Sequence, residues 1–490
     1  MPRVHFLILI LAAFLAVALF LAASALHFRL GFPLDDSWIH QTYARNLAQR
    51  GEWSFIPGKP SGGSTSPLWN ILLSLGFHLR LAPYFWTYFL GALFLFGVGV
   101  LIENTTRRLL PFYRPLLPWM GLLLIFEWRM VWMAASGMET LLHALLLSAI
   151  AMLVMDERPR FLTLGLLAGL AVWVRPDGLL LFPFLVLIAS LWPLPLKARL
   201  RQVLNLTLGF VPLFGFYLFF NLSLEGHPWP NTFYAKQTEY LFWQQKPILE
   251  RLGLYLLQWI HGPIVLLLPA VLFFFFHLFR APSGTFLAWF RLPNWILLMW
   301  WGTFFAIYLL RLPPYQHGRY VMPLLPLFLF WGTVGMMLAA RSGKIAWRRV
   351  GMSAWRISLG ALVVIYLFFG ARAYAQEVAF IEREMVDTAR WVRANLPPQA
   401  VIAAHDIGAL GYFDTHPLVD LAGLISPEVI PILNDEQALA AYLDAQGVDY
   451  LIVLQGIYPT LEAGREVVYQ GFSADIPGAE VTPMNVYRWR

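Results

Sequence analysis

The chain has 490 residues, of which 59% are hydrophobic and only 13% are charged, and its mean hydropathy is +0.62. This composition excludes an ordinary soluble domain and predicts that most of the chain lies in lipid. The net charge of +7 comes from Lys and Arg residues in short clusters between apolar runs, which is typical of topology signals and argues against a nucleic-acid partner. The chain has no cysteine, which excludes disulfides and thiolate metal sites.

The first apolar run, 4–26, is long enough to cross a bilayer. It lacks a convincing small-residue cleavage site, so we interpret it as a transmembrane helix with a cytoplasmic N-terminus rather than as a signal peptide. Further apolar runs follow at 84–102, 116–134, 141–155, 161–174, 179–192, 203–222, 252–279, 295–310, 320–340 and 357–369. Together they predict an α-helical multi-pass membrane protein with about eleven transmembrane helices.

The apolar stretch 67–81 decides the topology. If it crossed the membrane, the basic clusters after it would be divided between the two sides. If it lies as a helix at the outer interface, all of these clusters face the cytoplasm, as the positive-inside rule requires. The basic residues concerned are Arg107, Arg108, Arg114, Arg158, Arg160, Lys197, Arg199, Arg201, Arg280, Arg291, Arg341, Lys344, Arg348, Arg349 and Arg356. The polar loops then expected on the outer face are 27–83, 137–140, 175–178, 223–251 and 311–319.

The tail changes character at about residue 376, where charges become more frequent and apolar runs shorten. Its predicted elements are a helix at 377–395, strands at 400–404 and 450–454, and a helix at 435–446. We therefore expect two domains: a membrane domain at 1–372, which includes the outer loop 27–83, and an extracytoplasmic α/β domain at 373–490.

Two adjacent carboxylates, Asp35 and Asp36, open a predicted helix in the first outer loop. The positive end of the helix dipole favours the ionised form of a carboxyl group, so either residue could accept a proton or hold a metal. The alternative is that one of them only caps the helix. Capping explains one carboxylate and leaves its like-charged neighbour without a role.

The other outer loops each carry charged residues where a helix begins. Glu139 lies in a tight turn between apolar helices, where an acid is either functional or a helix cap. Arg175 and Asp177 form a similar turn, which an ion pair between them would also explain. Lys236 and Arg319 stand at helix ends, where a cation either binds a lipid phosphate or extends along its aliphatic stem to the interface.

The order of these motifs resembles the GT-C membrane glycosyltransferases, and among them most the terminal arabinofuranosyltransferases of mycobacterial cell-wall assembly and their relatives in other bacteria. The motifs that carry the resemblance are DD at 35–36, YARNL at 43–47, TSPLW at 65–69, GMET at 137–140, RPDG at 175–178, PNTFYAK at 230–236 and RYVMP at 319–323. The resemblance implies an inverting transfer of a sugar from a polyprenyl-phosphate donor to a cell-envelope glycan, at the extracytoplasmic face of a bacterial plasma membrane.

By this resemblance Asp35 is expected to be the catalytic base, and Asp36 to orient it or to bind the acceptor or a metal. Glu139 is expected to contact the sugar or the acceptor. The residues expected beside the donor phosphate are Lys236, Arg319, His317 and Arg175. Those expected around the substrates are His40, Tyr43, Asp177, Asn231 and Tyr234. Members of the family differ in metal dependence, so a divalent metal on Asp35 and Asp36 stays open.

Three alternatives remain at this stage. The sugar could be arabinofuranose, mannose or another polyprenyl-linked residue. A membrane transporter would instead place ionisable residues near the bilayer midplane, which is nearly free of charge here. An anchor for the tail would need only one transmembrane helix and no acidic outer loop.

Overall fold

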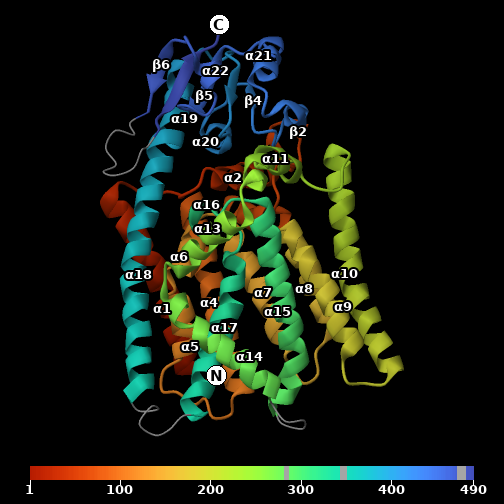
Figure 1. The fold of residues 1–490 in the computed structure, drawn as a ribbon. Coiled ribbons are helices and arrows are strands. Elements are labelled where there is room, and N and C mark those ends of the chain that lie inside the picture. Colours follow the sequence, from red (N-terminus) through yellow and green to blue (C-terminus); the bar gives the residue numbers. More distant parts are fainter. Residues whose placement is uncertain (281–285, 343–349, 472–481) are drawn as a thin grey trace.

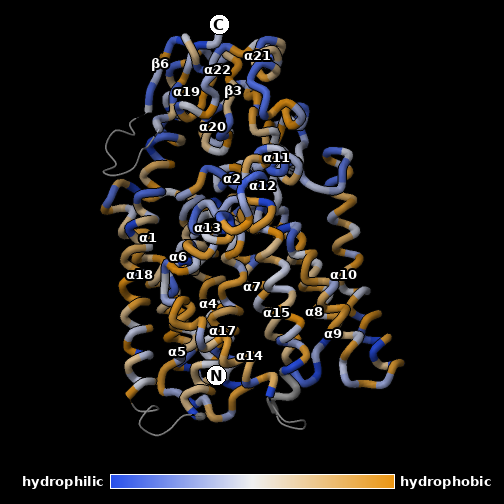
Figure 2. The backbone as a smooth tube through the Cα atoms, in the orientation of Figure 1, coloured by the Kyte–Doolittle hydropathy of each residue, from blue (hydrophilic) through white to orange (hydrophobic). Residues whose placement is uncertain are grey.

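The computed structural model describes residues 1–280, 286–342, 350–471 and 482–490. Long helices run side by side between the end of the molecule that carries the N-terminus and the end that carries a small C-terminal domain (Figure 1). Hydrophobic residues dominate these helices, whereas hydrophilic residues gather in the C-terminal domain and in α2 and α11 beneath it (Figure 2). The protein is therefore a multi-pass membrane protein with a polar domain at one end.

Seven helical segments of the described chain are long and apolar enough to cross a membrane. They are formed by α1 (Arg3–His27), α4 (Pro83–Leu109), α10 (Leu196–Glu225), η2 (Pro263–Leu266) with α14 (Leu268–Arg280), α15 (Phe286–Arg311), α16 (Tyr315–Gly318) with η3 (Met322–Leu324) and α17 (Leu325–Ser342), and α18 (Met352–Phe380). Three shorter apolar segments are α7 (Thr140–Val154), α8 (Phe161–Val174) and η1 (Pro176–Leu181) with α9 (Phe182–Leu191). Each of these segments lies within or overlaps a predicted apolar run.

Two predicted spans are broken. The run at 116–134 becomes α5 (Trp119–Ile125) and α6 (Trp128–Ala135), because the buried Glu127 side chain caps α6 by accepting hydrogen bonds from its first amides. The run at 252–279 was expected to be one helix, and this was wrong. It divides at Gly262, whose φ of 152° is a conformation that side chains rarely adopt, and Pro263 follows. The resulting α13 (Ile248–Ile260) precedes η2.

The stretch after the first outer loop forms α3 (Pro67–His78), which packs on α2 (Asp36–Arg50). At 12 residues, α3 is about 18 Å long, too short to cross a bilayer. At the opposite end of the molecule, Arg107 Nη2 lies 2.7 Å from His5 Nδ1, so the first basic cluster shares an end with the N-terminus. Lys344, Arg348 and Arg349 of the last basic cluster lie outside the described residues.

The C-terminal domain is built on a five-stranded sheet with the order β4-β3-β5-β7-β6. Its strands are β3 (Ile402–Ala404), β4 (Leu418–Asp420), β5 (Tyr450–Leu454), β6 (Val467–Gln470) and β7 (Met484–Arg488). Its helices are α20 (Gly408–Phe413), η6 (Pro427–Ile432), α21 (Glu436–Ala445) and α22 (Pro459–Glu462). The predicted strands and the helix at 435–446 thus correspond to β3, β5 and α21.

The two domains are joined by one continuous helical segment. Helix α18 continues through the π-helical η5 (Ile381–Val386) into α19 (Asp387–Asn395). The boundary expected at residue 372 therefore falls inside a helix. The remaining short elements lie between the membrane helices and the C-terminal domain and are β1 (Ser54–Ile56), β2 (Lys59–Pro60), α11 (Asn231–Glu239) and α12 (Leu241–Gln245).

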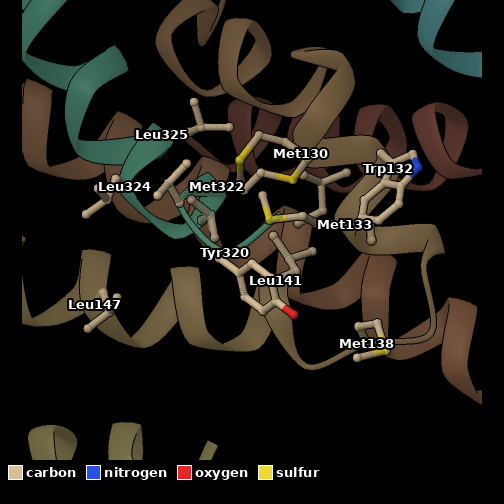
Figure 3. Close-up of a cluster of buried hydrophobic side chains, with 14 of the residues drawn as sticks. Met130, Trp132, Met133, Met138, Leu141, Leu147, Tyr320, Met322, Leu324 and Leu325 are labelled. Atoms are coloured by element: carbon tan, nitrogen blue, oxygen red, sulfur yellow. The ribbon is translucent and has the colours of Figure 1, made fainter. Parts of the chain in front are cut away.

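A core of buried side chains from α6, α7 and η3 lies below this junction. Met130 and Met133 of α6 gather with Leu141 of α7 and Met322 of η3, and the Tyr320 ring lies beside them (Figure 3). Each of these side chains is at most 5% exposed. Close packing of this kind fixes the start of η3 and with it the position of the neighbouring Arg319.

Candidate active site

The Asp35–Asp36 pair opens α2, and its two carboxylates have different partners. Asp35, only 8% exposed, accepts hydrogen bonds from the backbone amides of Gly408 (2.6 Å) and Ala409 (2.8 Å) in the C-terminal domain. A side chain at position 408 would lie 2.1 Å from the Asp35 carbonyl oxygen, so only glycine permits this approach. Burial raises the pKa of Asp35 to about 8, and the nearby Asp406 carboxylate adds to the shift. Asp35 therefore joins the two domains.

Asp36 instead faces basic residues of the membrane domain. Arg319 Nη2 donates a hydrogen bond of 2.7 Å to Asp36 Oδ2. Burial opposes the charge of Asp36, but the positive charges of Arg319 and Lys236 outweigh it and lower the pKa of Asp36. The Asp36 side chain is 39% exposed, and no described residue donates to its Oδ1. Asp36 is thus an ionised carboxylate with one oxygen available.

Three cations surround the Tyr320 ring, and we call Arg175, Lys236 and Arg319 the cation cluster. Their charged groups lie 5.5, 5.2 and 5.0 Å from the ring centroid. Lys236 Nζ donates to the Tyr320 hydroxyl at 2.7 Å, and Arg319 Nη2 donates to it at 3.1 Å. The buried Nη1 of Arg319 has no hydrogen-bond partner among the described residues. The cation cluster therefore has an unused donor, which suits an anionic ligand.

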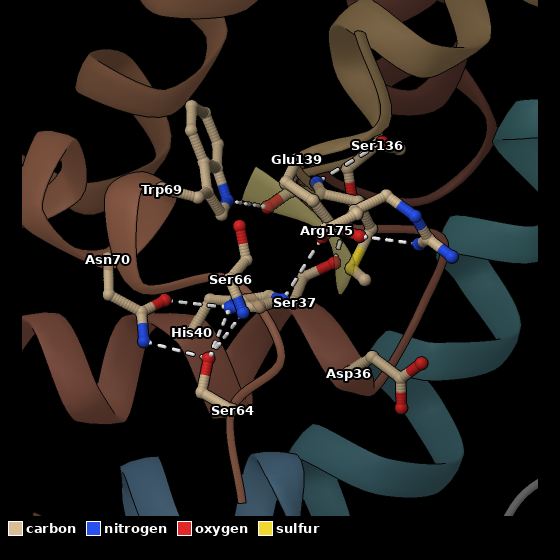
Figure 4. A network of polar contacts seen from close by, with 12 residues as sticks. Asp36, Ser37, His40, Ser64, Ser66, Trp69, Asn70, Ser136, Glu139 and Arg175 are labelled. Carbon is tan, nitrogen blue, oxygen red and sulfur yellow. Dashed lines mark hydrogen bonds and ion pairs between the residues drawn. The ribbon is translucent and has the colours of Figure 1, made fainter. Parts of the chain in front are cut away.

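Glu139 lies behind the cation cluster and holds Arg175. Its Oε1 accepts a hydrogen bond of 2.8 Å from Arg175 Nη1, and His40 Nε2 lies 3.2 Å from its Oε2. His40 is held in turn by Asn70 Oδ1, 2.7 Å from its Nδ1 (Figure 4). Burial alone would raise the pKa of Glu139, but the nearby His40 ring and the charge of Arg175 lower it.

The turn that carries Glu139 is itself fixed by two hydrogen bonds. Ser37 Oγ donates to the carbonyl of Ser136 at 2.8 Å, and Trp69 Nε1 donates to the carbonyl of Gly137 at 3.0 Å (Figure 4). Gly137 has a φ of 80°, which favours glycine at this turn. The first outer loop and the turn before α7 are therefore one packed unit.

Asp177 completes the surroundings of Arg175. Arg175 Nε lies 3.1 Å from Asp177 Oδ2, so the ion pair expected as an alternative for this turn does form. Tyr308 donates its hydroxyl proton to the same carboxylate, and His143 Nε2 lies 3.2 Å from Asp177 Oδ1. Arg175 thus forms ion pairs with two carboxylates, and its guanidinium also lies 5.5 Å from the centroid of the Tyr320 ring.

Besides Asp35, four of the expected site residues lie outside this constellation. The Tyr43 hydroxyl is fully buried and bonds to Ser61 Oγ and the amide of Gly63, so it holds the loop after α2, and substrate contact by Tyr43 stays a prediction. Asn231 is fully buried and donates to the carbonyl of Leu424 at 3.1 Å, which connects α11 to the C-terminal domain.

Tyr234 packs on the His227 ring at 5.1 Å. His317 lies 2.8 Å from Glu377 Oε1 and packs on Trp128, so it belongs to the contact with α18 and not to the cation cluster. The residues that the structure does bring together are Asp36, His40, Glu139, Arg175, Asp177, Lys236 and Arg319.

The sequence did not single out Tyr308, Tyr320 or Asn70. Tyr320 lies in the RYVMP motif directly after Arg319, but nothing in that motif assigned it a role of its own. Tyr308 stacks on Tyr320 with ring centroids 5.5 Å apart, but it lies within an apolar run that gives no sign of the contact.

Within the described residues, no group of three or more His, Asp or Glu side chains is arranged to hold a metal. Asp35 and Asp36 do not converge on one point.

Comparisons with known proteins bear on the fold. A family model described as a domain of unknown function (DUF8728) matches residues 372–487, which include the C-terminal domain. No curated protein matches the sequence. ArnT from Cupriavidus metallidurans bound to undecaprenyl phosphate aligns with a TM-score of 0.58 and 16% identity, over 99% of this chain and 98% of that chain.

Two other solved structures are similar. The Archaeoglobus fulgidus oligosaccharyltransferase aligns with a TM-score of 0.61 and 12% identity, over 92% of this chain and 69% of that chain. The arabinofuranosyltransferase AftD from Mycobacteria aligns with a TM-score of 0.50 and 15% identity, over 100% of this chain and 40% of that chain. These proteins are GT-C glycosyltransferases, so the chain has the GT-C fold that the sequence motifs indicated.

Proposed function

We propose that this protein transfers a sugar from a polyprenyl-phosphate donor to a glycan acceptor of the cell envelope, at the extracytoplasmic face of a bacterial plasma membrane. The observation that carries the proposal is the ionised Asp36 carboxylate, which has one available oxygen beside the cation cluster at an end of the membrane helices. The GT-C fold supports it, since ArnT is solved with undecaprenyl phosphate and the archaeal AglB with dolichol-phosphate.

The cation cluster is suited to the donor phosphate. Arginine binds phosphate through paired N–H donors, and lysine acts as a point charge. Arg319 has a buried Nη1 donor that no described residue uses. When the bond from the anomeric carbon to the phosphate oxygen breaks, negative charge accumulates on the leaving polyprenyl phosphate, and Arg319 and Lys236 offset it.

Asp36 is the base in this proposal, in place of Asp35 as the family resemblance suggested. An acceptor hydroxyl oxygen bonds to the anomeric carbon as the phosphate leaves from the opposite face, and the hydroxyl proton passes to Asp36 Oδ1. The configuration at the anomeric carbon is thereby inverted. Asp35 is poorly suited to this step because both of its oxygens accept backbone hydrogen bonds and burial raises its pKa to about 8.

Glu139 acts on the donor site through Arg175. It is 1% exposed and hydrogen-bonded to Arg175, so direct contact with a sugar would require it to give up this partner. Together with Asp177 and His40 it fixes the guanidinium against Tyr320. Glu139 and Asp177 are therefore positioning residues for the cation cluster.

Arabinofuranose is the first sugar to test, because the motif order resembles the arabinofuranosyltransferases and AftD is among the similar structures. Mannose is the second. Purified protein is incubated with decaprenyl-phosphate arabinofuranose or undecaprenyl-phosphate mannose and with octyl glycosides of short arabinofuranosyl or mannosyl oligosaccharides. Mass spectrometry then detects the extended glycoside, and NMR gives its anomeric configuration. An inverted product from either donor supports the proposal, whereas a product that retains the donor configuration contradicts it.

A further inference from the structure

The carboxyl ends of three parallel strands in the C-terminal sheet face the membrane domain. Strand β3 pairs in parallel with both β4 and β5, so the three strands end at the same edge. From the segments after these strands, Gly408 donates to Asp35, and Leu424 accepts a hydrogen bond from Asn231. Figure 1 shows this edge above α2 and α11. In open α/β sheets, the carboxyl ends of the strands are where ligands bind.

Asp406 follows β3 at this edge and carries an unsatisfied oxygen. Its Oδ2 is buried and accepts no hydrogen bond from any described residue. The charged groups that act on it are His405, Asp36 and Glu239, and Asp406 in turn acts on Asp35. Burial raises the pKa of Asp406, and the carboxylates of Asp36 and Glu239 add to the shift while His405 opposes it. Asp406 thus lies at the same junction as the Asp35–Asp36 pair.

A role in shaping a turn does not account for Asp406. Asp420, at the end of the neighbouring strand β4, does have such a role, because it accepts hydrogen bonds from the amides of Ala422 (2.8 Å) and Ile425 (2.7 Å). Among the described residues, no backbone amide donates to Asp406 in this way. The ionised carboxylate of Asp36 cannot donate either, and both Asp35 oxygens are engaged with the amides of Gly408 and Ala409. Asp406 Oδ2 is therefore left by the described residues as an acceptor that a ligand hydroxyl can use.

We propose that Asp406 binds a hydroxyl group of the acceptor glycan, so that the C-terminal domain forms one side of the acceptor site. This inference rests on the proposed function. Sugar hydroxyls donate hydrogen bonds, whereas a phosphate would be repelled by Asp406, Asp36 and Glu239. Asp36 takes the proton of the attacking hydroxyl, and Asp406 holds a second hydroxyl of the same sugar. The donor phosphate then lies on the cation cluster and the acceptor lies below the sheet edge.

The test compares Asp406→Ala and Asp406→Asn with the wild type in the full-length protein. The donors and octyl glycoside acceptors are those named above, and the slow transfer of the donor sugar to water is measured in the same samples. For Asp406→Ala we expect the acceptor KM to rise about ten-fold or more, with kcat within about three-fold and the donor KM unchanged. Hydrolysis of the donor by water is expected to fall by less than about two-fold.

The control is Asp435→Asn, which alters an exposed cap of α21 in the same domain and is expected to leave the acceptor KM unchanged. An unchanged acceptor KM in Asp406→Ala overturns the inference. Equal losses of transfer and hydrolysis overturn it as well, because they indicate a structural role. If the wild type neither transfers nor hydrolyses any donor, the proposed function fails and the inference fails with it.

Discussion

The adjacent carboxylates Asp35 and Asp36 allow a direct comparison, because Asp35→Asn and Asp36→Asn make the same chemical change one residue apart. Asp35 contacts the C-terminal domain, whereas Asp36 contacts Arg319. We expect Asp36→Asn to lower kcat by about 10²–10⁴-fold, the usual contribution of a general base. The new amide oxygen can still accept the hydrogen bond from Arg319, so the local structure is expected to persist.

The expected loss in Asp35→Asn is much smaller. Burial raises the pKa of Asp35 to about 8, so at pH 7 its carboxyl group is mostly neutral and asparagine replaces one neutral group with another. The variant loses one of two hydrogen bonds to Gly408 and Ala409 and leaves a buried amide unsatisfied, which costs about 1–3 kcal/mol. This cost weakens the contact between the domains. Sugar transfer is expected to remain within about ten-fold of the wild type.

Both variants are purified in detergent and assayed with saturating donor and acceptor, and their folding is checked by size-exclusion chromatography and thermal unfolding. Limited proteolysis reports whether the C-terminal domain stays docked. Suppose that Asp35→Asn proves as inactive as Asp36→Asn while its C-terminal domain remains docked. Asp35 would then be the base, and the roles assigned here to the two carboxylates would be wrong.

Three further outcomes follow from the same contacts. Arg319→Gln removes a buried charge beside the proposed donor phosphate and is expected to lower kcat/KM for the donor about 10²–10³-fold. The control is Arg311→Gln, which changes an exposed arginine and is expected to leave kcat/KM unchanged. A fall in kcat/KM of less than about three-fold in Arg319→Gln would contradict the role of Arg319. Gly408→Ala places a Cβ 2.1 Å from the Asp35 carbonyl oxygen, so its thermal stability should fall and proteolysis between the domains should rise. Gly360→Ala meets no neighbour and serves as the control, and equal behaviour of the two alanine variants would refute the contact. The pKa of Asp35 is about 8 in the folded protein and near 4 in an unfolded chain. The contribution of Asp35 to the free energy of unfolding is therefore full below about pH 4 and is lost as the pH rises toward 8. Identical pH profiles of thermal unfolding for the wild type and Asp35→Asn would exclude this contribution.

The membrane helices were predictable because their signal is local. Each apolar run is long enough to require a helix that satisfies its own backbone hydrogen bonds in lipid. The breaks were harder to predict, since Gly262 interrupts a run that remains apolar on both sides. At Glu127 a signal was present, because a lone acid in an apolar run commonly marks a special position.

The site was predictable only in part, because its contacts join residues far apart in the chain. The basic loops fix which side of the membrane each polar loop faces, and this places Asp36, Arg175, Lys236 and Arg319 on the same side without any tertiary information. The division of roles between Asp35 and Asp36 could not be predicted from the sequence. It depends on the amide of Gly408, 373 residues away, and no local pattern records such a contact.

The central claim is that Asp36 and the cation cluster together transfer a sugar from polyprenyl phosphate. The most direct test is the stoichiometry of the reaction, measured by quantifying released polyprenyl phosphate and extended glycan in the same sample for the wild type and for Asp36→Asn. We expect one polyprenyl phosphate released for each sugar transferred by the wild type, and both products reduced together by about 10²–10⁴-fold with Asp36→Asn. Release of no polyprenyl phosphate from either donor, together with binding of a soluble solute, would instead favour a transporter and contradict the claim.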